Sequence, residues 1–160
     1  MQHTRHLTKA QSAAQNLLVA GIIVGLLTCL GSTADLLGHL SFGQRAFRIR
    51  SVEHAVRMTY DAVRIFPAIA MVVGCVLGLR RARRARTWLR VALVAFLARE
   101  LVDVVVLGAS MAVDVKPQYL AMMIFWGSIH LVKTAVTTGV AGLLWFQTSE
   151  PEVIAWLEGD

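Results

Sequence analysis

The sequence contains little of what most enzymes and secreted domains depend on. Among its 160 residues there are two cysteines, three prolines and two tyrosines, and only 16% of the residues are charged, against about 25% in soluble domains. Cys29 and Cys75 lie in different apolar segments, at membrane depths expected to differ by more than about 10 Å, so we expect no disulfide between them. The sequence has no glycine-rich phosphate loop, nucleophile elbow or metalloprotease motif, so no class of enzyme is indicated.

Hydrophobic residues are in excess, at 56% of the chain, and the mean hydropathy is +0.60. They are concentrated in blocks of about 20 residues, the length that crosses a bilayer as a helix. Such blocks occur at residues 16–40, 61–79, 88–113 and 119–146. The sequence therefore predicts an all-α fold, an integral membrane four-helix bundle formed by a single domain of residues 1–160. A short cytoplasmic amphipathic C-terminal helix is expected at about residues 150–158.

The first block could also be the core of a signal peptide, because a basic segment precedes it. No small-x-small cleavage site follows it convincingly. We therefore interpret residues 16–40 as a first span that is retained.

The net charge of +6 comes almost entirely from arginine. The densest group, at residues 80–86, lies between the second and third blocks, and the positive-inside rule places it in the cytoplasm together with both termini. Arginines at residues 45–57 conflict mildly with this topology. Short loops and an arginine-rich composition suggest a bacterial inner membrane. Residues expected to bind anionic lipid headgroups or the acidic C-terminal segment are Arg80, Arg81, Arg83, Arg84 and Arg86. Nucleic acid is not an expected partner, because no aromatic stacking platform accompanies the charge.

The link before the second block has a helical pattern, with apolar residues on one face and polar residues opposite. Its polar stripe ends in Asp61 and Arg64. One interpretation is a helix whose polar stripe enters the outer leaflet of the membrane. The alternative is a solvated face followed by an arginine that extends to the membrane surface.

Charged residues inside the third and fourth blocks are the most informative feature, because an ionised group in a bilayer costs several kcal/mol unless it is paired or hydrated. The third block contains Arg99, Glu100 and Asp103, and the fourth contains His130 and Lys133. The two blocks are antiparallel neighbours, and the helical rise places Glu100 level with Lys133, and Asp103 level with His130. Arg99 is left over, and would need Asp35, a lipid or a partner chain.

Two interpretations of these matched pairs remain open. They could be buried ion pairs that fix which helices associate and in which register. They could instead form part of a proton or ion path, since chains of Asp, Glu and His near the membrane midplane serve as relays.

Small and polar residues also follow helical stripes in the first and fourth blocks. The stripe of the first block begins at Gly21 and Gly25 and ends at Asp35 and His39. Such stripes allow helices to pack closely. Alternatively, the stripes line an aqueous vestibule, with Asp35, His39 and Arg64 at its outer mouth.

No cofactor is predicted, because the sequence contains no compact set of metal ligands. A metal site near His39 and His54 is the weaker possibility. A haem held by His39 and His130 is weaker still, because their expected depths differ by roughly 10 Å.

Two functions follow from these patterns. The first is a small homo-oligomeric membrane channel or transporter-like protein that passes protons or small ions through the polar seam. The second is a non-catalytic scaffold or accessory subunit of a larger membrane protein complex. In the second case the charged residues would only fix helix register.

Overall fold

The computed structural model describes residues 8–46, 52–82, 84–112 and 120–158, and for some of these, among them His39 and His54, it gives the backbone alone. The described residues form helices, with no β-strand among them. The helices are α1 (Lys9–Ala46), α2 (Val52–Val63), α3 (Ile65–Leu79), α4 (Ala85–Ala112), α5 (Leu120–Gln147) and α6 (Pro151–Glu158). The predicted all-α fold is confirmed, and the C-terminal helix lies within one residue of its predicted start.

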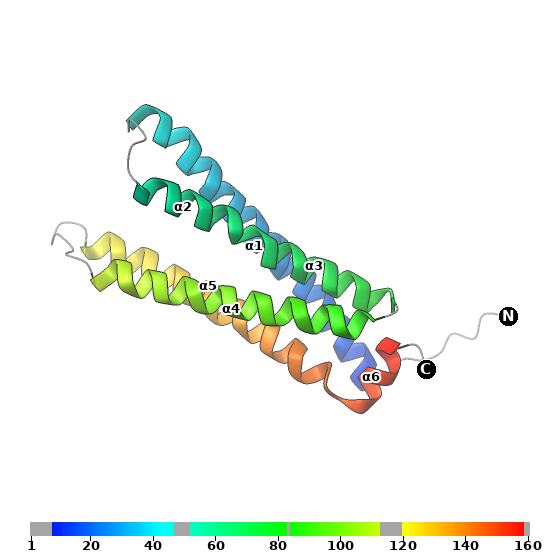
Figure 1. The fold of residues 1–160 in the computed structure, drawn as a ribbon. Coiled ribbons are helices and arrows are strands. Elements are labelled where there is room, and N and C mark those ends of the chain that lie inside the picture. The colour runs from blue at the N-terminus through cyan, green and yellow to red at the C-terminus, as the bar shows by residue number, and fades with distance from the viewer. Residues whose placement is uncertain (1–7, 47–51, 83, 113–119, 159–160) are drawn as a thin grey trace.

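The long helices run antiparallel along one common direction, as Figure 1 shows. α1 packs against α3, α3 against α4, and α5 against both α1 and α4. The start of α1, the turn between α3 and α4, and α6 lie at one end of the molecule, which we call the α6 end. Towards the opposite end, α1 and α2 diverge from α4 and α5 (Figure 1). We call this the splayed end.

Three segments of the described residues are long and apolar enough to cross a membrane, namely Lys9–Gly38, Met58–Leu79 and Ile124–Gln147. These correspond to the first, second and fourth predicted spans. α4, the predicted third span, is as long as α5 at 28 residues but does not qualify. The physical reason is its charge, because Arg99, Glu100 and Asp103 interrupt its apolar sequence.

The second predicted span consists of two helices with a break between them. α2 ends at Val63 and α3 begins at Ile65, with Arg64 at the N-cap. Pro67 accounts for the break, because proline has no N–H to donate and its ring clashes with the carbonyl four residues earlier, that of Val63. The polar residue Asp61 is buried, whereas Val63 is exposed. The interpretation of this stripe as a solvated face is therefore wrong for Asp61, and the break places Arg64 at the inner side of the bundle.

Tight contact between α1 and α3 explains the stripe of small residues on α1. A Cβ atom on Gly21 would lie 2.7 Å from Cys75 Sγ, and one on Gly25 would lie 2.7 Å from Val72 Cγ2. Further along the same face, Thr28 and Ser32 are buried. The close-packing interpretation of this stripe is confirmed from Gly21 to Ser32, and the contact it makes lies within one chain.

Replacing Gly25 with alanine should lower the free energy of unfolding by about 1–3 kcal/mol, the usual cost of overpacking. The new methyl group would also lie 3.2 Å from the backbone oxygen of Ala68, which cannot move aside as a side chain can. Gly31 is the matched control on the same helix, because a Cβ atom there meets nothing within 4 Å. Gly31→Ala should be neutral or gain up to about 1 kcal/mol in helix propensity. Thermal unfolding in detergent measures both variants, and equal effects would show that α1 and α3 are not in close contact at Gly25.

Candidate functional site

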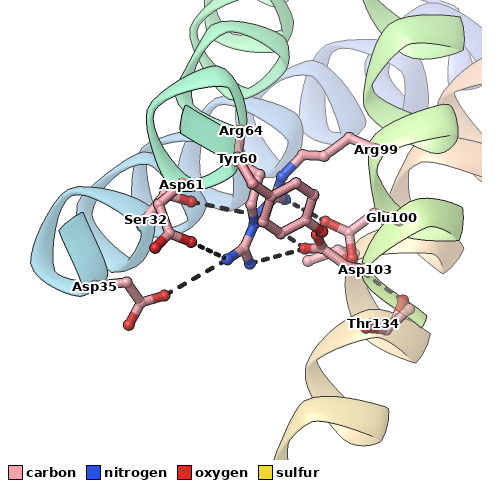
Figure 2. Close-up of polar contacts among 10 residues, drawn as sticks. Ser32, Asp35, Tyr60, Asp61, Arg64, Arg99, Glu100, Asp103 and Thr134 are labelled. Atoms are coloured by element: carbon pink, nitrogen blue, oxygen red, sulfur yellow. Dashed lines mark hydrogen bonds and ion pairs between the residues drawn. The ribbon is translucent and has the colours of Figure 1, made fainter. Parts of the chain in front are cut away.

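Arg64 is the centre of a network of charged side chains where α1, α2, α3 and α4 meet (Figure 2). Its guanidinium lies 2.8 Å from Asp103 Oδ2, 3.3 Å from Asp61 Oδ1 and 3.8 Å from Asp35 Oδ2. It also stacks over the Tyr60 ring, with 5.3 Å between Cζ and the ring centroid. The packing of α1, α2 and α4 around Arg64 thus brings one cation into contact with carboxylates from three helices.

Arg99 forms the second, deeper half of this network. Its Nη1 donates to Glu100, and its Nη2 lies 3.2 Å from Asp103 Oδ2 and donates to Ser32 Oγ at 3.3 Å. Asp103 therefore bridges the two arginines, and the two halves form one continuous chain. Arg99 needs no lipid or partner chain to balance it, so that expectation from the sequence is wrong.

Hydroxyl groups complete the coordination of two carboxylates. The Tyr60 hydroxyl donates to Asp103 Oδ1, and the Thr137 hydroxyl donates to Glu100 Oε2 at 2.9 Å. Thr137 brings α5 into the network, which then joins every long helix. Each of these two carboxylates therefore has both an arginine and a hydroxyl donor as partners, and hydrogen bonds of this charge-assisted kind are the stronger ones in proteins.

Exposure falls steadily along the network from the splayed end inwards. The exposed fraction of the side chain is 52% for Asp35, 14% for Asp103 and 2% for Glu100. Beyond Glu100, towards the α6 end, the interior is apolar, with Phe96, Met71 and other side chains fully buried. The polar chain therefore has its most exposed member at Asp35 and ends against an apolar interior beyond Glu100.

The two cross-helix pairs predicted from matched depths are wrong. Glu100 pairs with Arg99 instead of Lys133, and Asp103 pairs with Arg64 and Arg99 instead of His130. Among the described residues, Lys133 forms no salt bridge, although it is close enough to Glu100 and Asp103 for electrostatic attraction. His130 is exposed. Both residues share one face of α5 with Thr137, because positions three, four and seven apart lie together on a helix.

Of the predicted outer mouth, the structure brings Asp35 and Arg64 together and leaves Asp35 half-exposed at the splayed end. The side chains of His39 and His54 lie outside what the structure describes. Tyr60, Ser32 and Thr137 were missed as members of the network. Ser32 and Thr137 stood on the small-residue stripes of the sequence, but Tyr60 carried no comparable signal.

Within the described residues, no group of three or more histidine, cysteine or acidic side chains is arranged to hold a metal ion. The carboxylates that do come together are already bound by arginine. The network as described thus consists of arginine–carboxylate ion pairs and hydroxyl hydrogen bonds, with Lys133 nearby and outside the salt bridges of the described residues.

At the α6 end, the arginine-rich turn and α6 contact each other through both charge and stacking. Arg86 Nη1 lies 3.3 Å from Glu158 Oε1, and the Arg81 guanidinium stacks over Trp156 at 4.9 Å. Arg80 and Arg84 are exposed, and Arg83 lies outside the described residues. The acidic segment thus meets the arginine group through one described salt bridge, while most of the buried surface of α6 is apolar.

Comparison with known proteins adds no relative to this description, since no family model, no curated protein and no solved structure matches the chain significantly.

Proposed function

We propose that the chain is a membrane protein whose four long helices form a bundle across the bilayer, and that it takes up protons or small ions from one side through its polar network. The observation that carries this proposal is the one-sided network itself. It begins at the half-exposed Asp35 and ends at the buried Glu100 against an apolar interior. Buried ionisable residues of this kind are typical of proton and ion pathways.

The closed apolar end favours a transporter-like mechanism over an open channel. A channel needs a polar path through the whole bilayer, whereas Phe96, Leu93, Met71 and Leu144 fill the interior beyond Glu100. The junction at Arg64, where Pro67 removes one helical hydrogen bond, is the proposed position at which α2 and α3 change their relative angle. In this proposal the α6 end faces the cytoplasm, as the arginine-rich turn indicates.

His130 and Lys133 are proposed as a second approach to the same carboxylates, in addition to the one that begins at Asp35. His130 is exposed, and Lys133 is half-buried and without a salt bridge among the described residues. Histidine is the side chain that most readily exchanges a proton near neutral pH. In this proposal a proton passes from His130 towards Lys133, which lies one helical turn further along the same face of α5, and then towards Glu100 and Asp103.

In liposomes containing a pH-sensitive dye, His130→Gln should lose most of the proton flux that the unaltered protein shows, with unchanged thermal stability. The reason for the unchanged stability is that the exposed imidazole makes no hydrogen bond or ion pair in the described structure. Ser128→Ala is the matched control, because Ser128 is exposed on the same part of α5 and bonds only to the Ile124 carbonyl. Its flux should be unchanged.

Glu100→Gln tests the deep end of the same route and should also abolish flux. Flux that persists in both His130→Gln and Glu100→Gln would rule out this path. An unaltered protein that is folded in liposomes but passes neither protons nor sodium or potassium ions would overturn the proposed function.

The second candidate function, a scaffold or accessory subunit, is favoured by a different observation. The halves of α4 and α5 near the splayed end expose apolar side chains around most of their circumference, including Val105, Val106, Ile124, Phe125 and Trp126. The other helices of the chain leave these faces uncovered. Helices of another membrane protein could pack against them. Recovery of the protein from mild detergent as a stable complex with other chains, together with absence of flux, would support this alternative.

We also propose that the chain associates with itself, through glycines other than those that pack against α3. The glycines of α1 that suggested it pack within the chain, whereas Gly31, Gly139 and Gly142 have open space around them. Mass photometry in detergent would distinguish a closed oligomer from a monomer.

A further inference from the structure

The start of α4 carries basic side chains that the chain itself does not neutralise. Among the described arginines at residues 80–90, the only salt bridge is that of Arg86 with Glu158. α4 has no acidic residue of its own in its first turn, where a negative charge would favour the positive end of the helix dipole; the carboxylate described there is that of Glu158 on α6.

Arg90 shows the imbalance most clearly. Its Nη2 donates to Ser149 Oγ at 3.2 Å, and its guanidinium stacks over the Trp145 ring at 5.3 Å. Its Nε is buried without a hydrogen-bond partner, as is the Nε of Arg86 one helical turn earlier. The two guanidiniums are held in place by neighbouring side chains, and because each Nε is buried, an anion could be bound only through their terminal nitrogens.

The turn before α4 keeps arginine at positions where the backbone favours glycine. Arg81 and Arg84 have positive φ angles of 49° and 67°. The hydrogen bonds from Arg81 N to Gly78 O and from Ala82 N to Leu77 O are those of a Schellman motif, whose left-handed position is usually glycine. A side chain in that conformation costs about 1–2 kcal/mol. Stacking on Trp156 gives Arg81 a structural role. The exposed Arg84 has no such contact in the described structure, so we infer that the chain keeps an arginine there for its positive charge.

Tryptophan side chains surround this region, and their exposure indicates what the arginines face. Trp145, over which Arg90 stacks, is exposed, as are Trp88 elsewhere on the first turns of α4 and the apolar side chains Val91 and Phe146. Tryptophan is enriched where a membrane protein passes through the headgroup layer. Arginine binds phosphate oxygens through several donors at once. Stacking on Trp145 holds the guanidinium of Arg90 in place.

We propose that the start of α4 is a binding site for the phosphate group of an anionic phospholipid, held by Arg86 and Arg90 beside the Ser149 hydroxyl, with Arg84 attracting the negative surface around it. This inference relies on the membrane location in the proposed function but not on transport. The site lies at the α6 end, at the start of α4 (Figure 1), whereas the polar network is formed by residues near the middle of α4, such as Arg99 and Asp103. Lipid binding and flux can therefore fail independently.

The test measures binding of phosphatidylglycerol and phosphatidylcholine to the full chain in neutral detergent, by native mass spectrometry and by the shift in thermal unfolding. The unaltered protein should bind and be stabilised by phosphatidylglycerol in preference to phosphatidylcholine. Arg90→Gln should weaken phosphatidylglycerol binding by about tenfold or more, which is the effect of losing one hydrogen bond to a charged group. Lys9→Gln is the matched control, because it removes one exposed positive charge at the same end, and should leave the preference in place.

Arg84→Gly gives a second, independent readout because its two effects have opposite signs. Without lipid, it should raise the unfolding temperature by relieving the backbone at φ 67°. With phosphatidylglycerol, it should gain less stabilisation than the unaltered protein. Inorganic phosphate at matched ionic strength distinguishes a lipid site from a site for a soluble anion.

Equal stabilisation by phosphate alone would overturn the assignment to lipid. Equal binding of the two lipids by the unaltered protein, or an Arg90→Gln variant that binds like the Lys9→Gln control, would overturn the site.

Discussion

Replacing Arg99 with methionine should lower the free energy of unfolding by about 3–5 kcal/mol, because removal of one partner leaves buried carboxylates uncompensated. Arg99 and Glu100 are the most deeply buried charged residues of the network, with exposed side-chain fractions of 3% and 2%. Replacing both, in Arg99→Met with Glu100→Gln, should recover much of that loss. Asp103 stays paired with Arg64 in the double variant. Chemical or thermal unfolding in detergent measures each variant.

A second double-mutant experiment, with Lys133, distinguishes the Arg99–Glu100 pair of the structure from the Glu100–Lys133 pair predicted from matched membrane depths. Glu100→Gln combined with Lys133→Met should show weaker coupling than Glu100→Gln combined with Arg99→Met. The reason is that Glu100 contacts Arg99 directly and interacts with Lys133 only at longer range. Losses that add within about 0.5 kcal/mol for the Arg99 pair would show that the two side chains do not meet.

Replacing Leu157 with alanine should lower the free energy of unfolding by about 2–5 kcal/mol, the range for removing a buried leucine side chain. Leu157 is 1% exposed, and a Cβ atom on Gly78 would lie 3.7 Å from its Cδ2. Leu157 therefore lies against the end of α3 at ordinary contact distance, and the side chain that lies too close for an easy fit of a Cβ atom on Gly78 is Leu18 of α1, at 3.1 Å. Thermal unfolding and limited proteolysis of the C-terminal segment report the loss.

Glu158→Gln is the matched control at the adjacent position. It removes the salt bridge to Arg86, in which the glutamate is 48% exposed, and exposed pairs contribute at most about 1 kcal/mol. If Glu158→Gln released α6 as readily as Leu157→Ala, charge would hold the C-terminal segment in place. The structure instead indicates that burial of Val153, Trp156 and Leu157 holds it.

The helices could be predicted from the sequence because the signal extends over many residues. Apolar blocks, the arginine-rich turn and the C-terminal helix all have patterns longer than one helical turn. The break at Arg64 was missed, although Pro67 was visible three residues later. The length and apolar character of Met58–Leu79 are compatible with one continuous span, and a proline near the start of a helix need not end it.

The candidate site could be predicted in its location but not in its pairing. Arg99, Glu100 and Asp103 were identified because charge in an apolar block is conspicuous. Their partners were assigned wrongly, since residues adjacent in a helix do not normally face each other. Arg99 nevertheless reaches Glu100 because its side chain is long and flexible. Arg64 was expected at the outer mouth, and its reach to Asp103 depends on how α2, α3 and α4 pack, which helical periodicity does not specify.

The charge of α4 also has a consequence for how the protein is made. In a bilayer, a helix with Arg99, Glu100 and Asp103 near its middle is poorly suited to insert alone, because each such residue adds about 2.5–3.5 kcal/mol to the cost of insertion. Arg64 and Ser32, which contact Asp103 and Arg99, are synthesised before α4, whereas Thr137 follows on α5. If α4 crosses the bilayer as proposed, the earlier helices supply most of the partners that it needs, and insertion of α4 would coincide with assembly of the network.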